Sequence, residues 1–202
     1  MSLNVRQLVF TALFAALFVA MSAIKIPLGF TPVPFSLQNL ALMLAGVFLG
    51  ARFGFYSIAI VIALTAAGLP LLQGQGGISY LMGGTGGFLI AFPFCALAIG
   101  YFTGKLLAGD LRRTKPVLFY VLLFLIFEAF GSFACYVIGI PWMMAVYDFS
   151  LTKALAVGCY PFLPGDAAKA VLSTIIVGAL HAYVPILGSK KSGSSAGLTV
   201  RA

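Results

Sequence analysis

Long apolar stretches separated by short polar segments dominate the pattern along this chain. A helix needs about 20 apolar residues to cross the hydrocarbon core of a bilayer, and stretches of roughly 17–25 residues qualify. Six stretches reach or approach this length, although the second is short. We therefore predict six transmembrane helices, at residues 5–24, 37–51, 53–69, 88–107, 116–140 and 166–187.

The positions of the basic residues predict how these helices are oriented. Cytoplasmic loops of membrane proteins carry an excess of Lys and Arg. With both termini inside, the outer loops contain only Lys25 and Lys153. The inner segments then contain the basic residues Arg6, Arg52, Lys105, Arg112, Arg113, Lys115, Lys190, Lys191 and Arg201. We therefore predict cytoplasmic termini, with the longer and less regular loops on the outer side.

The composition agrees with residence in a lipid bilayer. Hydrophobic residues make up 62% of the 202 positions and charged residues only 8%, whereas soluble domains average about 25% charged residues. The net charge of +8 comes from a few basic residues between apolar stretches, a pattern that serves membrane topology and predicts no binding of nucleic acid. We predict an all-α integral membrane protein with one domain, residues 1–187, and a flexible polar tail, residues 188–202.

A glycine-rich segment at residues 68–92, GLPLLQGQGGISYLMGGTGGFLIAF, interrupts the apolar pattern in mid-chain. Glycine in a helix interior costs roughly 1 kcal/mol relative to alanine, so this segment is not predicted to be helical throughout. Irregular backbone near membrane depth occurs where it is buried in protein or lines a cavity. We predict that the segment forms one wall of a ligand pocket on the extracellular side, with candidate contacts from Gln75, Ser79, Tyr80, Gly84, Thr85 and Gly86.

Two further outer segments converge on the same side of the membrane. Residues 25–36, KIPLGFTPVPFS, contain three prolines that hold the backbone extended. Residues 141–165 form the third outer segment, in which Ser150 could cap a short amphipathic helix. Trp142, Tyr147 and Tyr160 from this segment are candidate pocket walls, although an interfacial aromatic belt is a simpler role for such residues.

Asp166 and Lys169 are the leading candidates for polar contact with a ligand. They stand three residues apart, so they face the same side of the sixth predicted helix near its outer end. Asp166 lies in the first helical turn, where the helix dipole stabilises a carboxylate. The pair offers one acceptor and one cationic donor next to the outer segments, and an intrahelical ion pair without a ligand is the alternative.

Gln38 and Asn39 begin the second predicted helix and add amide groups to the same region. Their side chains could bind amide or carbonyl groups of a ligand, or could serve only in capping and interhelical hydrogen bonds. Glu128 lies midway along the fifth predicted helix, where a carboxyl group is either protonated or hydrogen-bonded to a neighbouring helix. Glu128 is therefore a candidate for proton relay.

Sequence motifs for several other functions are absent. The chain has no GxxxxGK[ST] nucleotide-binding loop, and its three cysteines and single histidine, His181, do not have the spacing of a metal site. An intramembrane hydrolase would need a nucleophile and a base, and His181 is predicted on the inner side, away from the polar candidates. We therefore predict no enzymatic activity, no cofactor and no metal site.

Ala12, Ala16 and Ala20 recur at every fourth residue along the first predicted helix. Small residues at this spacing let helices approach closely in lipid. The alanine stripe therefore predicts either internal packing or a docking face for another membrane subunit.

Three sequence blocks, in this order, resemble the BioY family over about residues 6–187: TPVPFSLQ, then the glycine-rich segment, then PFLPGDAAKA. BioY proteins are the biotin-specific S components, or substrate-capture subunits, of energy-coupling factor (ECF) transporters. The resemblance implies six helices, high-affinity biotin binding and uptake, a membrane T component and two cytosolic ATPases as partners, and the prokaryotic plasma membrane as the location. The chain departs from the family at Gly83 and Phe88, because the usual form of this block is closer to GPTGGY.

The resemblance also implies roles for the polar candidates. Asp166 would accept hydrogen bonds from the ureido N–H groups of biotin, Gln38 would donate to the ureido carbonyl, and Lys169 would pair with the ligand carboxylate or hold Asp166 in place. The alanine stripe would dock the T component, as a small-residue face does in related S components. The alternatives are an S component for another vitamin, such as thiamine or riboflavin, and a stand-alone secondary carrier that uses Glu128.

Overall fold

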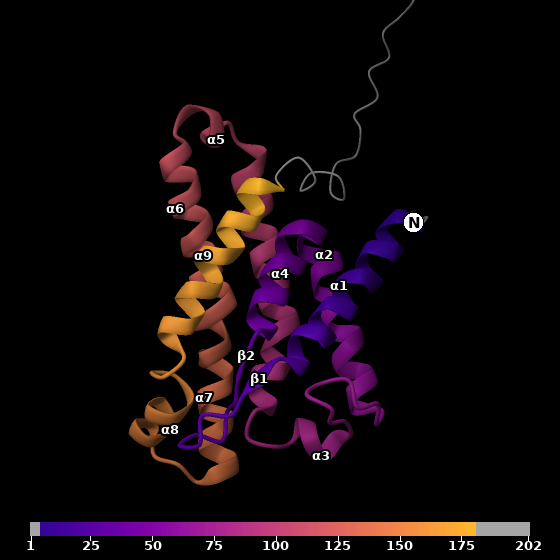
Figure 1. Ribbon diagram of the computed structural model, residues 1–202, viewed down its shortest axis with the longest axis vertical. Helices are drawn as coiled ribbons and strands as arrows, with labels where there is room; N and C mark the ends of the chain where they lie inside the picture. Colours follow the sequence, from indigo (N-terminus) through magenta and orange to yellow (C-terminus); the bar gives the residue numbers. More distant parts are fainter. Residues whose placement is uncertain (1–4, 181–202) are drawn as a thin grey trace, which may run out of the picture.

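The structure, a computed structural model, describes residues 5–180 and is mostly helical. Its helices are α1 (Val5–Ala23), α2 (Gln38–Ala66), α3 (Ile78–Leu81), α4 (Gly86–Ala108), α5 (Leu111–Thr114), α6 (Pro116–Phe127), α7 (Ala134–Tyr147), α8 (Leu151–Gly158) and α9 (Leu163–Ala179). A π-helical turn, η1 (Glu128–Phe133), joins α6 to α7, and two short strands are β1 (Lys25–Ile26) and β2 (Phe35–Ser36) (Figure 1). The predictions for His181 and for the tail at residues 188–202 lie outside the described residues.

Within residues 5–180, four helical stretches are long and apolar enough to cross a bilayer, judged by length and composition. They are α1, α2, α4 and the continuous run Pro116–Tyr147 formed by α6, η1 and α7. α8 and α9, bent by 48° at the break between them, qualify as a fifth span when taken together. The structure is thus mostly helical, with four or five candidate membrane spans among the described residues, which agrees with the predicted helical membrane protein.

α2 covers both the second and the third predicted helices and is broken at Gly50, one residue before the predicted end of the second. This residue has φ 74° and ψ 176°, a backbone conformation that suits glycine and few other residues. The chain doubles back there, because a Cβ atom on Gly54 would lie 3.1 Å from the Cα atom of Gly46, whereas eight residues of straight helix span about 12 Å. α2 is therefore a hairpin of two helical halves that pack against each other (Figure 1).

α4 packs along α2 through small residues. A Cβ atom on Gly46 would lie 2.8 Å from the carbonyl oxygen of Ala96, and one on Gly100 would lie 2.3 Å from the backbone nitrogen of Ala51. Membrane helices approach this closely where glycine faces the neighbouring backbone. Large side chains buried in the surrounding core include Phe18, Leu42, Met43, Ile58, Ile99, Phe119, Leu123 and Phe127.

The fifth predicted helix extends past its expected end at residue 140. Pro141 lies inside α7, which continues to Tyr147 and ends where Asp148 adopts a left-handed conformation. Proline is tolerated within membrane helices because neighbouring groups satisfy the backbone that it frees. The expectation of a loop from residue 141 is therefore wrong as far as Tyr147, and Trp142 projects from a helix.

The irregular segments gather at one end of the bundle. β1 pairs antiparallel with β2, so the proline-rich segment is a small hairpin, and the Thr31 hydroxyl ties it to α8 by donating to the Val157 carbonyl at 2.5 Å. Ser150 caps α8, as predicted, by accepting a hydrogen bond from the backbone N–H of Lys153. α3, within the glycine-rich segment, lies at this end too, whereas α5 and the first described residues lie toward the other (Figure 1).

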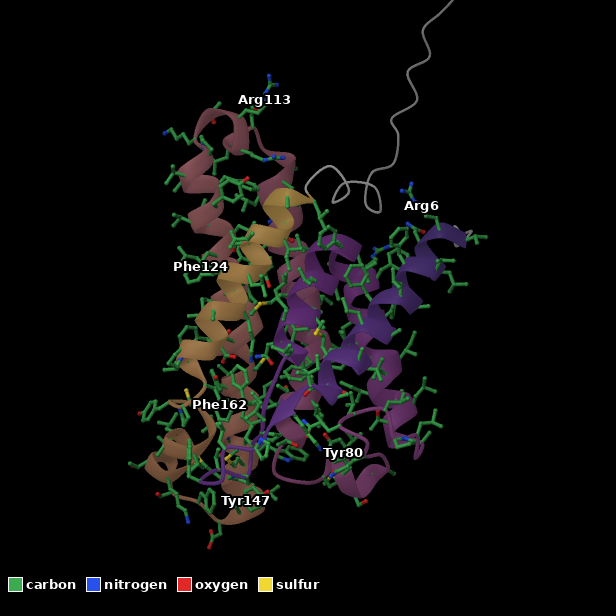
Figure 2. The ribbon with its side chains drawn as sticks, in the orientation of Figure 1. Arg6, Tyr80, Arg113, Phe124, Tyr147 and Phe162 are labelled. Atoms are coloured by element: carbon green, nitrogen blue, oxygen red, sulfur yellow. The ribbon has the colours of Figure 1, made fainter. Side chains whose placement is uncertain are left out.

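Figure 2 shows the side chains at both ends of the bundle. Tyr80 and Tyr147 lie at the end that carries α3 and α8, whereas Arg6 and Arg113 lie toward the end that carries α5. The bundle thus separates its basic end from the end where the irregular segments meet.

Candidate ligand-binding site

Asp166 and Lys169 form a salt bridge near the start of α9, with 3.0 Å between Lys169 Nζ and Asp166 Oδ1. Both residues are buried, with exposed fractions of 2% and 6%. Removing such ions from water costs several kcal/mol each, unless good geometry and further hydrogen bonds offset the loss of hydration. The surrounding helices should therefore supply additional partners to this pair.

Tyr136 of α7 and Phe35 of β2 are those partners. The Tyr136 hydroxyl donates a short hydrogen bond to Asp166 Oδ2, so both carboxylate oxygens are engaged. Lys169 Nζ lies 4.2 Å from the centre of the Phe35 ring, within range of a cation–π interaction. Residues from three distant parts of the sequence thus fix the carboxylate in one position.

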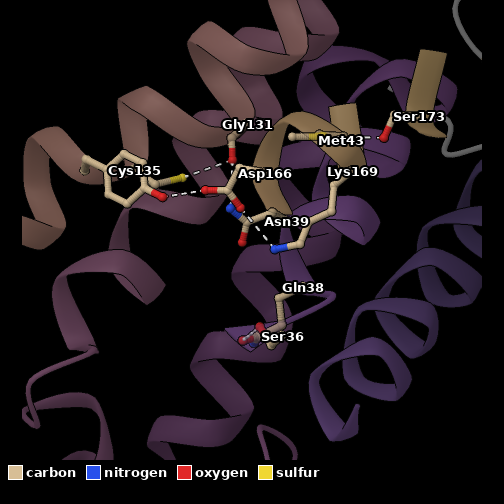
Figure 3. A network of polar contacts seen from close by, with 10 residues as sticks. Ser36, Gln38, Asn39, Met43, Gly131, Cys135, Asp166, Lys169 and Ser173 are labelled. Carbon is tan, nitrogen blue, oxygen red and sulfur yellow. Dashed lines mark hydrogen bonds and ion pairs between the residues drawn. The ribbon is translucent and has the colours of Figure 1, made fainter. Parts of the chain in front are cut away.

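Gln38 and Asn39, adjacent at the start of α2, have different surroundings. Asn39 Nδ2 donates to the Gly131 carbonyl in η1 at 3.1 Å, which is an interhelical hydrogen bond. Gln38 is 3% exposed, and its Oε1 accepts from the Ser36 hydroxyl at 3.1 Å. Its Nε2 is buried and has no partner among the described residues. Figure 3 shows both amides near Asp166 and Lys169.

These groups line a space of about 570 Å³, partly open to solvent, which we call the inner cavity. Phe88, Phe92 and Phe162 contribute aromatic walls. Sites for small molecules commonly combine such apolar walls with a few polar groups that orient the ligand. The lining residues are Val33, Pro34, Ser36, Gln38, Asn39, Gln73, Thr85, Phe88, Leu89, Phe92, Cys135, Tyr136, Gly158, Phe162, Asp166 and Lys169.

A second and wider space of about 940 Å³, which we call the vestibule, adjoins the inner cavity. The two share the lining residues Pro34, Gln73 and Thr85. Burial raises the pKa of Tyr80 in the vestibule wall, so its hydroxyl stays neutral at physiological pH. The lining residues are Lys25, Pro27, Thr31, Pro32, Pro34, Gln73, Gln75, Ser79, Tyr80, Gly83, Gly84, Thr85 and Tyr147.

The predicted site residues therefore divide between the two spaces. Asp166, Lys169, Gln38 and Asn39 line the inner cavity. The glycine-rich segment lines the vestibule through Gln75, Ser79, Tyr80 and Gly84, and its Thr85 lines both spaces.

Three other predicted contacts line neither space. Trp142 braces the glycine-rich segment from α7, because its indole N–H donates to the Gly83 carbonyl at 2.9 Å. Gly86 is buried, and a Cβ atom there would lie 1.7 Å from the Leu81 carbonyl oxygen, so this position has no room for a side chain. Tyr160 is 57% exposed and lies outside both linings.

Sequence reasoning missed Tyr136, Ser36 and Phe35. Tyr136 carried a usable signal, because a hydroxyl within an apolar membrane stretch needs a hydrogen-bond partner. Phe35 and Ser36 lie in a short strand whose pairing with β1 sets their direction, and sequence spacing alone could not show this.

Glu128, the candidate for proton relay, begins η1 and lines neither space. Its Oε1 atom is buried and has no hydrogen-bond partner among the described residues. Proton relay through Glu128 remains a prediction.

Sequence comparison relates the chain to known transport proteins. The sequence model of the BioY family matches residues 1–186. The chain is similar to the biotin transporter BioY of Rhizobium etli, with 39% identity over 191 residues that cover 93% of this chain and 100% of that protein. It is also similar to the biotin transporter BioY of Lactococcus lactis subsp. cremoris, with 35% identity over 177 residues that cover 86% and 89% of the two chains.

Structural comparison leads to the same group of proteins. The fold resembles the crystal structure of the S-component for biotin from an ECF-type ABC transporter, with a TM-score of 0.77 and 31% sequence identity. The matched region covers 90% of this chain and 95% of that chain. The chain therefore belongs to the BioY family, as its three sequence blocks predicted.

Proposed function

We propose that this protein binds biotin at the outer face of the membrane with high affinity, as the S component of an ECF-type transporter. One observation carries the proposal: the inner cavity presents a fixed carboxylate acceptor, Asp166, and an amide donor, Gln38 Nε2, that has no partner within residues 5–180. The names of the similar transporters from Rhizobium etli and Lactococcus lactis support biotin as the ligand.

The chemistry of biotin is complementary to the inner cavity. Its ureido group has two N–H donors and one carbonyl acceptor, which match the Asp166 carboxylate and the Gln38 amide. Its sulfur-containing ring and alkyl chain are apolar and suit the walls formed by Phe88, Phe92 and Phe162. A buried polar group without a partner costs roughly 1–3 kcal/mol, so a ligand that satisfies Gln38 gains both affinity and specificity.

The geometry favours a positioning role for Lys169. Its Nζ is already 3.0 Å from Asp166 Oδ1 and lies over the face of the Phe35 ring. A ligand carboxylate at this point would compete with Asp166 for the same cation and would repel it. We therefore assign Lys169 to hold Asp166, and the ureido end of biotin to the inner cavity.

The fold supports six membrane crossings when the two halves of α2 count separately and α8 with α9 counts as one. The first described residues and the α5 end lie together, and this end carries Arg6 and Arg113 (Figure 2). The excess of Lys and Arg there supports a cytoplasmic position for both termini. The cavities then face outward, in the cell membrane of a prokaryote.

The partners follow from the need for an energy source. The chain has no nucleotide-binding loop, so uptake against a gradient requires ATPases on other chains, and we propose a T component with two cytosolic ATPases. Ala12, Ala16 and Ala20 are all exposed on α1, whereas Thr11, Phe18 and Ser22 of the same helix are buried. This exposed alanine stripe supports α1 as the docking face for the T component.

A ligand panel tests the proposal against its nearest alternatives. Purified protein in detergent, without ATP, should bind biotin tightly and should bind thiamine and riboflavin at least about a thousandfold more weakly. Thiamine is a cation, whereas the inner-cavity carboxylate already has a cationic partner, and riboflavin has a larger fused ring system. Tight binding of thiamine or riboflavin, with none of biotin, would overturn the proposal.

Transport assays separate an S component from a stand-alone carrier. Reconstituted alone in vesicles, the protein should bind biotin without accumulating it against a gradient. Proton-driven accumulation that is lost in Glu128→Gln would favour the secondary carrier.

A further inference from the structure

The inner cavity fixes which end of the ligand remains outside it. Asp166 carries a negative charge at the buried end, and both of its oxygens already accept hydrogen bonds. A second carboxylate placed there would be repelled in surroundings of low dielectric constant. Under the proposed function, the acid end of biotin must therefore point away from Asp166.

The vestibule is the space into which that acid end leads. It shares Pro34, Gln73 and Thr85 with the inner cavity, so these residues form a neck between the two spaces. Both spaces open to solvent, and with that solvent included the vestibule, at about 940 Å³ against about 570 Å³, is the larger of the two. The alkyl chain of a ligand that passes the neck thus enters a wider region, which has room for an additional group.

The polar groups of the vestibule suit an acid or an amide. Among the described residues that line it, Lys25 alone is charged. Lys25 is exposed, and its Nζ donates to the backbone carbonyl of Gln73 at 3.1 Å, so it is positioned at the neck without an acidic partner among the described residues. Ser79 and Gln75 add groups that can both donate and accept hydrogen bonds. None of these groups demands a free carboxylate.

We propose that the vestibule is a second binding region, which receives the acid end of the ligand and accepts groups joined to it through an amide. The ligand class is then the cyclic-urea acid together with its carboxyl conjugates, for which Nε-biotinyl-lysine is a test compound. This inference rests on the proposed function. It adds that recognition is strict at the ureido ring and permissive at the carboxyl group.

Competition against radiolabelled biotin on the purified full chain in detergent tests this asymmetry. Nε-biotinyl-lysine should bind within about tenfold of biotin, and biotin methylated on a ureido nitrogen should bind more than about 100-fold more weakly, because the methyl group removes a donor to Asp166. Tight binding of biotin together with a loss of more than about 100-fold for biotinyl-lysine would overturn this inference and leave the proposed function standing. A failure to bind biotin would overturn both.

Two variants on α3 test whether the group joined to the biotin carboxyl lies in the vestibule. Ser79→Trp fills part of the vestibule and should raise the ratio of the Kd for biotinyl-lysine to the Kd for biotin by about tenfold. Ile78→Trp is the matched control, because Ile78 is 67% exposed and does not line the vestibule, and this variant should leave the ratio unchanged. An unchanged ratio in Ser79→Trp would show that the added group lies elsewhere and would overturn the inference.

Lys25→Gln tests which group reaches the neck. An exposed ion pair contributes about 0.2–1 kcal/mol, so biotin should bind about two- to fivefold more weakly to this variant. Neutral biotinamide should bind to the variant and to the unmodified protein equally well. An equal loss for both ligands would contradict a carboxylate at Lys25.

Discussion

The inner cavity and the glycine-rich wall of the vestibule are built in different ways, although they meet at Thr85. In the inner cavity, buried side chains set the chemistry: Asp166 is held by Lys169 and Tyr136, and the Gln38 amide nitrogen has no partner in the part of the chain that the structure describes. In the wall, backbone shape dominates, and Gly83 accepts a hydrogen bond from Trp142. The difference indicates that the inner cavity selects the ligand, whereas the wall determines how far the ligand can extend.

The largest expected effect comes from removing the inner-cavity charge. Asp166→Asn leaves Lys169 as a buried cation without its anionic partner, which typically costs about 3–5 kcal/mol of stability. Biotin affinity should fall by about 100-fold or more, because the principal acceptor for the ureido N–H groups is lost. Calorimetric titration and thermal unfolding of the detergent-solubilised variant measure the two losses.

Asp148→Asn is the matched control for that charge. Asp148 is exposed, ends α7 in a left-handed conformation that asparagine tolerates well, and lines neither space. This variant should unfold and bind biotin like the unmodified protein. If Asp166→Asn behaves like Asp148→Asn, the inner cavity does not select the ligand through its carboxylate.

The two neighbouring amides, Gln38 and Asn39, should differ about tenfold in how much their loss weakens biotin binding. Gln38→Leu removes a buried donor that has no partner among the described residues, together with the acceptor for the Ser36 hydroxyl. Because relief of the buried donor offsets the lost hydrogen bond, we expect about a tenfold loss of biotin affinity with little net loss of stability in the empty protein. Asn39→Leu removes the hydrogen bond to Gly131, so its main effect should be a loss of about 0.5–1.5 kcal/mol in stability. If Asn39→Leu lost affinity and Gln38→Leu lost stability instead, Asn39 would be the ligand-binding amide and Gln38 the structural one.

Changing the glycine-rich wall should have a smaller effect on affinity. In Gly86→Ala the new Cβ atom would lie 1.7 Å from the Leu81 carbonyl oxygen, so the backbone must shift. We expect a loss of about 1–3 kcal/mol in stability from this crowding, and a loss of biotin affinity of less than about tenfold.

Gly104→Ala, also in α4, meets nothing within 4 Å and should stabilise the helix by up to about 1 kcal/mol. A loss of affinity in Gly86→Ala as large as that of Asp166→Asn would show that the wall, too, selects the ligand.

The smallest expected effect on binding comes from the alanine stripe. Ala16→Trp adds bulk to an exposed face of α1 that lies away from both cavities, so biotin affinity should be unchanged. Co-purification with the T component and the ATPases should fall sharply. Ala63→Trp, at an exposed alanine of α2, should leave co-purification intact. Equal assembly of both variants would exclude the alanine stripe as the docking face.

Much of the fold could be predicted from the hydrophobic pattern and the glycines. Apolar length located α1 and α4 within about two residues, an error typical of helix ends. The turn within α2 lies at Gly50, one residue before the predicted end of the second stretch. The end of α7 was not predictable in this way, because Pro141 resembles a helix stop in sequence and its neighbours in the bundle compensate for the hydrogen bond that it removes.

The contacts of the candidate site were predictable from the sequence where the two residues in contact are close together along the chain. Asp166 and Lys169 meet because three residues on a helix place them on one face. The Tyr136–Asp166 contact joins residues 30 positions apart and depends on how α9 packs against α6 and η1, which lead into α7. Tyr160 lies outside both linings, because an aromatic residue in an outer segment can face outward as readily as inward.

The structure of the protein with biotin bound is the most direct test of the claim that the inner cavity selects the ureido ring. We expect the ureido oxygen about 2.7–3.2 Å from Gln38 Nε2, a ureido nitrogen within the same range of the Asp166 carboxylate, and the ligand carboxylate in the vestibule on the side of Lys25. A biotin molecule bound in reverse, with its carboxylate on Lys169 and its ring in the vestibule, would contradict the account.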